Sequence, residues 1–144
     1  SDMTRTMFYG EPTEAFRKAY LAVFTAHTKA AEGIKEGISG KEADKIARDV
    51  LESLGYGKYF THSLGHGIGV NIHEYPTLSP RGEARLKNNM VFSNEPGVYL
   101  NGKFGIRIED SCHLVNGKYK SFMKDDKSLI ILGGDKIKKE KLYK

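Results

Sequence analysis

The pattern of apolar residues changes at Gly57, and this change limits the folds open to the chain. Before Gly57, apolar residues recur at helical spacing; after it, glycines multiply and β-branched residues alternate with polar ones. Turn dipeptides divide this second part at Tyr75-Pro76, Ser79-Pro80, Glu95-Pro96, Asn101-Gly102 and Asn116-Gly117. Two helices followed by hairpin-linked antiparallel strands indicate the α+β class, in which helices cover one face of a sheet.

Two amphipathic helices are predicted in the first part. The first covers residues 13–35 and has one apolar stripe. The second begins at Ser39, which forms a capping-box pattern with Glu42, and it ends where Gly55 supplies a left-handed residue. The run Thr4–Tyr9, before both helices, is strand-like.

Charge and hydropathy exclude several classes of protein. The net charge is +5, but the segment Gly133–Lys144 holds five lysines against Asp135 and Glu140 and therefore carries +3 of it. We expect this segment to be a solvated, fraying tail, and we expect no basic groove for nucleic acid. The chain also has no apolar run near the roughly 18 residues of a membrane span, so no membrane partner is expected.

The chain has a single cysteine, Cys112, so no internal disulfide can form. Its 144 residues are enough to bury one apolar core without such a bridge. A chain of this kind fits a reducing compartment, and we expect a cytoplasmic protein. No positive cluster surrounds Cys112 in sequence, which predicts a small buried side chain rather than a reactive thiol.

Three of the five histidines lie in the segment His62–His73. Their first spacing, of four residues, occurs on zinc-binding helices, but Gly65, Gly67 and Gly69 oppose a helix here. Read as a strand, the even positions share one face and the glycines share the other, where a ligand or another backbone can approach closely. A hydrogen-bonded structural role is the ordinary interpretation of one histidine; three beside a glycine ladder favour a functional site.

Two later strands each carry a carboxylate. Glu95 ends the run 91–95, and Glu109 belongs to the alternating run 106–110. Such carboxylates most often face solvent on an edge strand. If the sheet instead gathers Glu95 and Glu109 beside His66, it forms a mixed oxygen and imidazole pocket suited to divalent Mn, Co, Fe or Zn. The spacing alone leaves both interpretations open.

Four motifs follow one another along the chain: His66-Gly-Ile-Gly, His73-Glu-Tyr-Pro, Asn94-Glu-Pro-Gly-Val-Tyr99 and Gly105-Ile-Arg-Ile-Glu-Asp110. In this order they resemble the signatures of the pita-bread metallopeptidases, in the Xaa-Pro branch of proline dipeptidases and Xaa-Pro aminopeptidases. The opening residues 1–6 resemble the segment that carries the second metal-binding aspartate of that family. Methionine aminopeptidases share the fold and the ligands but match these motifs less well.

The resemblance implies a pita-bread fold: a curved antiparallel sheet covered by helices, here incomplete on its N-terminal side. Residues 1–144 would be a truncated C-terminal catalytic domain. Two divalent ions (Mn, Co, Zn or Fe) would be bridged by Asp2 and Glu109 in the full enzyme, with His66 and Glu95 completing the shell of one ion. Because the first aspartate of the family lies upstream of Asp2, at most one ion is expected in this fragment.

The resemblance also implies catalytic roles. His62 and His73 would contact the substrate and stabilise the tetrahedral intermediate, Glu95 would move a proton to the leaving nitrogen, and Arg107 would orient the carboxylates. Prolidases often carry an arginine after the His-Glu-x-Pro motif. This chain has Thr77 there and Arg81 further on, so a carboxylate-binding role is transferred to neither.

The implied reaction is hydrolysis of the peptide bond before proline, in dipeptides or longer peptides, by an enzyme that is a homodimer in its full-length form. The fragment itself is expected to be inactive, because it lacks the upstream aspartate. Two alternatives remain open. One is a non-catalytic pita-bread module used for binding; the other is a creatinase-like amidinohydrolase, which the intact ligand set disfavours.

Overall fold

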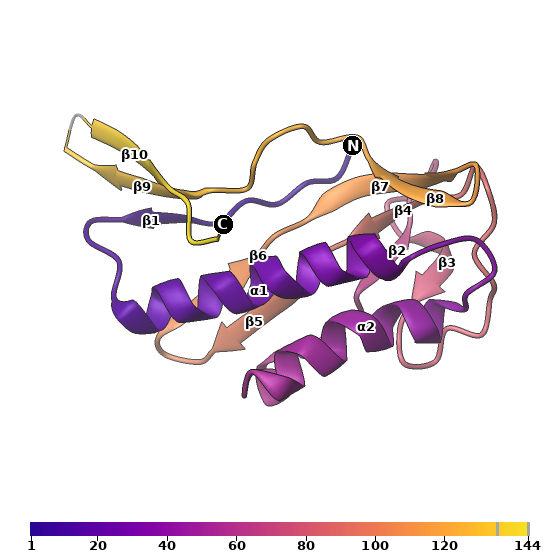
Figure 1. Cartoon of the computed structure of the whole chain (residues 1–144), viewed down its shortest axis with the longest axis horizontal. Helices are drawn as coiled ribbons and strands as arrows, with labels where there is room; N and C mark the ends of the chain where they lie inside the picture. The colour runs from indigo at the N-terminus through magenta and orange to yellow at the C-terminus, as the bar shows by residue number, and fades with distance from the viewer. Residues whose placement is uncertain (135, 144) are drawn as a thin grey trace.

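The computed structural model describes residues 1–134 and 136–143. Its elements run in the order of Figure 1. The helices are α1 (Glu14–Gly33), α2 (Gly40–Ser53) and a short 3-10 helix, η1 (Gly57–Tyr59). The strands are β1 (Met7–Tyr9), β2 (Gly65–Gly67), β3 (Glu74–Leu78), β4 (Val91–Asn94), β5 (Gly97–Leu100), β6 (Phe104–Arg107), β7 (Asp110–Val115), β8 (Lys118–Ser121), β9 (Leu129–Gly133) and β10 (Lys136–Glu140).

Both predicted helices are confirmed, and local side chains fix where they begin. The Thr13 hydroxyl accepts a hydrogen bond from Phe16 N at the start of α1. At the start of α2, Ser39 and Glu42 form the reciprocal capping box. Gly55 has a φ of 82°, which is the left-handed conformation expected just after the helix. The helices therefore form where short-range signals place them.

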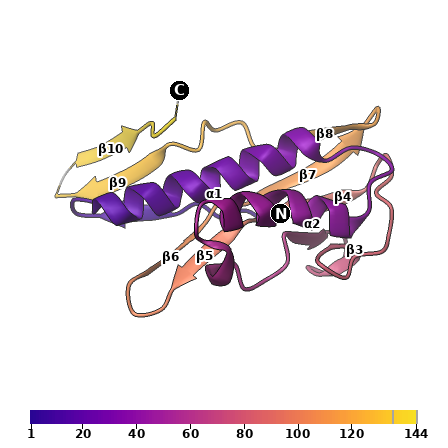
Figure 2. The same cartoon turned by 60° about the horizontal axis from the view of Figure 1, so that its bottom comes forward.

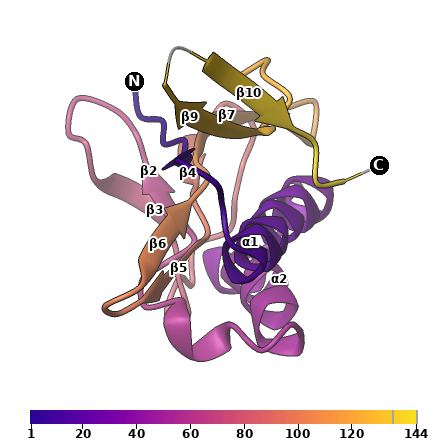
Figure 3. The same ribbon diagram turned by 90° about the vertical axis from the view of Figure 1, so that its left-hand side faces the viewer.

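Within residues 1–134 and 136–143 the strands form three sheets, and α1 and α2 lie on one side of them, as Figure 3 shows. The largest sheet is antiparallel throughout, in the order β3-β2-β4-β7-β8. A β5-β6 hairpin and a β1-β9-β10 sheet complete the set. The α+β class is confirmed. One pair differs from the expected pattern, because β1 runs parallel to β9.

The hairpin formed by β4, β5, β6 and β7 is interrupted in the middle. Asn94 pairs with Asp110 on one side of the interruption, and Gly97 pairs with Arg107 on the other. Because the register is the same on both sides, Glu95 stands opposite Glu109 at the break. Figure 2 shows the β5-β6 hairpin extending beyond the β4 and β7 end of the sheet.

One apolar core joins the helices to the sheets. The side chains fully buried in it include Tyr20, Ile34, Leu51, Leu64, Leu78, Leu86, Phe92, Ile106, Ile108, Leu114 and Leu129. Cys112 is also fully buried, as its sequence context predicts, and burial raises the pKa of its thiol well above the ordinary value. Among the described residues, no helix has the length and hydropathy needed to cross a membrane.

Two predictions about strands are wrong. The segment His62–His73 is not one strand: only β2 is paired, and Val70 and Ile72 beyond it are exposed. The register of β2 against β3 shifts between His66 and Gly67, which ends regular pairing. The strand predicted over Thr4–Tyr9 is also too long, since only the last three residues form β1. Thr4 makes a single bridge to Glu109.

The C-terminal tail is also more ordered than predicted. Residues 136–140 form β10, which pairs along its whole length with β9. An ion pair between Arg17 and Glu140, at 2.8 Å, ties β10 to α1. The lysine side chains of β10 remain exposed, so the prediction was right about solvation and wrong about fraying. Asp135 and Lys144, also in the predicted tail, lie outside the described residues.

Candidate metal centre

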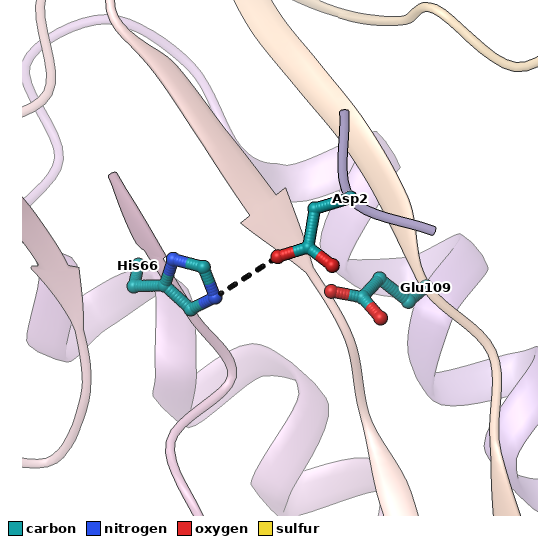
Figure 4. Close-up of side chains that lie close together, drawn as sticks. All are labelled: Asp2, His66 and Glu109. Atoms are coloured by element: carbon teal, nitrogen blue, oxygen red, sulfur yellow. Dashed lines mark ion pairs between the residues drawn. The ribbon is translucent and has the colours of Figure 1, made fainter. Parts of the chain in front are cut away.

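Asp2, His66 and Glu109 face one another (Figure 4) and, together with Glu95, which contacts His66, they form the candidate metal centre. One ligand atom from each of Asp2, His66 and Glu109 lies within 4.8 Å of the others. His66 Nε2 is 3.5 Å from Asp2 Oδ2 and 3.0 Å from Glu95 Oε1. Three of the four side chains that the resemblance assigns to metal thus converge, and the fourth, Glu95, joins them through its contact with His66. Glu109 is buried and the others are partly exposed.

Neighbouring strands bring these side chains together. His66 is the middle residue of β2, Glu95 directly follows β4, and Glu109 directly precedes β7. The strands β2, β4 and β7 are adjacent in the sheet, and Glu95 and Glu109 are opposite each other in the interrupted hairpin. Asp2 is joined to β7 by a hydrogen bond from its backbone N to Ser111 Oγ, at 3.2 Å.

Glycine brings β2 close to its neighbour. A Cβ atom on Gly65 would lie 1.9 Å from the carbonyl oxygen of Ser93, so only glycine fits without movement of the backbone. Ser93 then links the two strands through its hydroxyl group, which accepts from His66 N at 3.0 Å and donates to Glu95 Oε1 at 2.8 Å. The positions of His66 and Glu95 are therefore fixed by one serine.

The hydrogen bonds of His66 favour a role for its Nε2 atom as a metal ligand. Its Nδ1 lies 3.0 Å from the carbonyl oxygen of Gly67 and must donate to it. In the neutral ring, Nε2 then carries a lone pair directed at Asp2 and Glu95, an arrangement that a cation between them would stabilise.

The repulsion between the carboxylates is a second indication that the cluster binds a metal ion. Like charges opposite each other in a hairpin are unfavourable, and Glu95 and Glu109 occupy such positions. Burial is the main cause that raises the pKa of Glu109; a hydrogen bond from Thr4 opposes it, and the charges of Glu95 and Asp2 raise it further. A divalent ion would offset this repulsion. Oxygen donors with one imidazole suit Mn, Co, Fe or Zn, so the residues fit the expected group.

An open pocket of about 440 Å³ lies against the centre. It is lined by His62, Ser63, Gly65, His66, His73, Glu74, Thr77 and Glu95. His73 is exposed, and its ring packs edge-on against His66 with centroids 4.4 Å apart. The structure therefore places both of the histidines expected to contact substrate in one cavity beside the metal ligands. Thr77 also lines this pocket, whereas Arg81 does not.

A tyrosine that the sequence interpretation gave no role connects His62 to Arg107. His62 Nδ1 donates to the carbonyl oxygen of Ser63 at 2.8 Å, and its Nε2 is hydrogen-bonded to the Tyr99 hydroxyl at 2.8 Å. The same hydroxyl accepts from Arg107 Nη1 at 3.4 Å. Its position at the end of the Asn94–Tyr99 motif, four residues after Glu95, was the signal available in the sequence.

Arg107 lies beside Thr4 and Glu109. Its Nε donates to Thr4 Oγ1 at 3.1 Å and is 3.7 Å from Glu109 Oε2. Thr4 itself makes a short hydrogen bond from its hydroxyl to Glu109 Oε2. The Arg107 side chain is 40% exposed, so its remaining N–H groups are accessible to other partners.

The chain is similar to known metallopeptidases. The sequence model of metallopeptidase family M24 matches residues 1–116. An Xaa-Pro dipeptidase of Pyrococcus furiosus is 43% identical over 130 residues, which is 90% of this chain and 37% of that protein. The chain thus spans little more than a third of the length of this curated relative.

Solved structures of related enzymes share the fold. An Xaa-Pro dipeptidase from Bacillus anthracis is 43% identical and superposes with a TM-score of 0.89, covering 92% of this chain and 37% of that one. An X-prolyl aminopeptidase from Caenorhabditis elegans, described as a cytosolic enzyme with a di-nuclear active site, is 31% identical with a TM-score of 0.76. It matches 90% of this chain and 22% of its own.

Proposed function

Because this chain belongs to metallopeptidase family M24, we propose that it carries the catalytic side chains of an enzyme that hydrolyses the peptide bond before proline. Residues 1–144 correspond to part of the C-terminal catalytic domain of such an enzyme. The observation that carries this proposal is the convergence of Asp2, His66 and Glu109, with Glu95 against His66, beside a pocket lined by further histidines. The Xaa-Pro dipeptidases named above support the choice of substrate.

Asp2, His66, Glu95 and Glu109 would hold divalent metal. When bound, the ions lower the pKa of a water molecule toward neutrality and polarise the carbonyl group that it attacks. The described residues supply one such group of donors, so one ion per chain is expected. A second ion would share Asp2 and Glu109 and would need further ligands; the di-nuclear site of the Caenorhabditis elegans enzyme supports this arrangement for a full-length protein.

Each remaining side chain has a proposed task. Glu95 accepts a proton from the attacking water and passes it to the leaving nitrogen, since its Oε1 faces the centre beside His66 Nε2. His73 donates a hydrogen bond to the substrate from its exposed position in the pocket. His62, whose ring is held between Ser63 and Tyr99, shapes the pocket and meets the substrate on its other side.

Arg107 orients rather than reacts. Its guanidinium lies 3.7 Å from Glu109 and holds Thr4 and Tyr99 by hydrogen bonds. The bond before proline is a tertiary amide without N–H, so the pocket must recognise the shape of the proline ring and a free end of the substrate. A cavity of about 440 Å³ has room for a dipeptide or the end of a longer peptide.

We also propose a cytoplasmic location and, for a full-length protein, a homodimer with manganese. The single buried Cys112 and the cytosolic Caenorhabditis elegans relative support the first of these. The resemblance alone supports the other two. Sedimentation and metal analysis of a full-length protein would check them.

A chimera tests the proposed reaction. The matching part of the Bacillus anthracis enzyme is replaced by this chain, loaded with Mn²⁺ and assayed for release of proline from Ala-Pro. Activity that is lost in His66→Ala and retained in His113→Ala, a histidine of β7 that does not line the pocket, would support the proposal. A folded chimera that binds Mn²⁺ but does not cleave Ala-Pro would contradict it and favour the binding module.

A further inference from the structure

Arg5 is a partly buried residue whose five guanidinium N–H groups all have acceptors. Its Nη1 donates to the carbonyl oxygens of Thr4 and Glu109, at 2.8 and 2.6 Å. Its Nη2 donates to Asp110 Oδ1 at 2.7 Å and to Asp125 Oδ1 at 2.5 Å, and its Nε donates to Asp125 Oδ2 at 2.7 Å. Only 9% of the side chain is exposed.

These bonds join three segments that are distant in sequence. Thr4 belongs to the N-terminal segment that carries Asp2, Glu109 and Asp110 lie where β6 gives way to β7, and Asp125 lies in the connection between β8 and β9. The acceptor on Glu109 is the backbone carbonyl of a proposed metal ligand. Arg5 thus holds the backbone of two segments that each provide one carboxylate of the centre.

The N-terminal segment needs such support, because Asp2 precedes β1 and has no strand of its own. Its other attachments are also hydrogen bonds to residues 107–111. Ser111 Oγ bonds the Asp2 backbone, Thr4 bridges to the Glu109 backbone and bonds its carboxylate, and the Thr6 hydroxyl bonds the Arg107 backbone. The Arg5 guanidinium is rigid and planar, and it adds hydrogen bonds to the Glu109 backbone and to the carboxylates of Asp110 and Asp125. A lysine has one nitrogen and could not reach all these acceptors.

The charges around Arg5 are balanced within the cluster. Asp110, which is 1% exposed, also accepts from Lys127 Nζ at 2.9 Å and from Ser121 Oγ at 2.7 Å. Two cations therefore face two carboxylates, and Arg5 brings no net charge toward the centre that would repel a metal ion. Its hydrogen bonds are also the leading cause that lowers the pKa of Asp125 to about 2.

We propose that Arg5 is a positioning residue that sets the separation of the Asp2 and Glu109 carboxylates and thereby the metal affinity of the centre. Arg5 contacts neither metal nor substrate and acts through the backbone of Thr4 and Glu109. The inference rests on the proposed metal centre. It adds a residue that neither the sequence motifs nor the ligand set had assigned a task.

The test compares Arg5→Lys with Arg17→Lys in this chain. Arg17 is a matched control, because it also bonds two carboxylates, Glu11 and Glu140, and a backbone carbonyl. It lies near the start of α1 and contacts none of the proposed metal ligands. We expect Arg5→Lys to weaken Mn²⁺ binding, measured by calorimetry, by about 10- to 100-fold. We also expect it to change the visible absorption of bound Co²⁺, which reports ligand geometry, whereas Arg17→Lys changes neither.

A second pair keeps the inference testable if Arg5→Lys does not fold. Asp125→Asn weakens the Arg5 cluster at its partly exposed acceptor, and Asp126→Asn is its neighbouring control. Asp125→Asn is expected to weaken Mn²⁺ binding by about 3- to 10-fold, less than loss of the guanidinium itself. Mn²⁺ affinity within twofold of wild type in the Arg5 or Asp125 variant, or an equal loss in its control, would overturn the inference. Absence of saturable Mn²⁺ binding in the wild type would instead overturn the proposed centre on which it rests.

Discussion

His27 is a buried histidine of α1, with 4% of its surface exposed. Burial lowers its pKa from 6.5 to about 4; the attraction of Asp110, whose Oδ2 lies 3.6 Å from Nε2, opposes this shift but is smaller. Lys127 and Arg5 lower the pKa further. The folded chain therefore keeps His27 neutral at a pH where the unfolded chain protonates it.

This difference predicts acid sensitivity. Between pH 6.5 and 4 the unfolded state binds more protons than the native state, so the stability contribution present above pH 6.5 is lost as the pH falls. The 2.5-unit difference corresponds to about 3 kcal/mol in the free energy of unfolding. Urea unfolding from pH 7 to 4 should show a flatter dependence for His27→Gln than for wild type; parallel curves would contradict the assignment.

The two histidines whose rings pack edge-on, His66 and His73, should respond differently to substitution. His66 Nε2 faces the carboxylates, so His66→Ala should weaken Mn²⁺ binding by about 100-fold or more. His73 lines the pocket, so His73→Ala should leave the affinity within about threefold of wild type. Calorimetric titration of both variants checks this, and a larger loss in His73→Ala would reverse their roles.

Secondary structure was predictable where its signals are local. The ends of α2 are determined by residues close to them in sequence, Ser39 and Glu42 at its start and Gly55 after its end. The strand expected over His62–His73 was wrong because pairing depends on distant partners: β2 is flanked by β3 and β4, and the register shift at His66 ends the ladder. Likewise, nothing near residues 136–140 reveals that β9 offers them an edge.

Close approach of β2 to β4 gives a prediction about Gly65. Its added Cβ would meet the Ser93 backbone at 1.9 Å, whereas a Cβ at Gly133 in β9 would meet nothing within 4 Å. Gly65→Ala should lower the free energy of unfolding by about 3 kcal/mol, and Gly133→Ala by less than about 0.5 kcal/mol. Urea midpoints of the two variants measure the difference; equal midpoints would show that the strand can move apart from Ser93.

The centre is assembled from residues far apart in the sequence, between Asp2 and Glu109, which limits what the sequence could reveal about it. The Asn101-Gly102 dipeptide predicts a hairpin, but counting outward from a two-residue turn would place Glu95 opposite Ile108. The loop has three residues, because Leu100 pairs with Phe104, and this register brings Glu95 opposite Glu109. The side chains that support the ligands were not predictable in this way. Tyr99 and Arg5 act through partners far away in sequence, and only the folded chain shows them.

The direct test of this account is a crystal of the chain grown with Mn²⁺, with diffraction recorded at the manganese absorption edge. We predict one anomalous peak per chain, in bonding contact with His66 Nε2 and with carboxylate oxygens of Asp2, Glu95 and Glu109. A peak elsewhere, a peak that His66 does not ligate, or no peak among these four side chains would contradict the assignment of the metal centre.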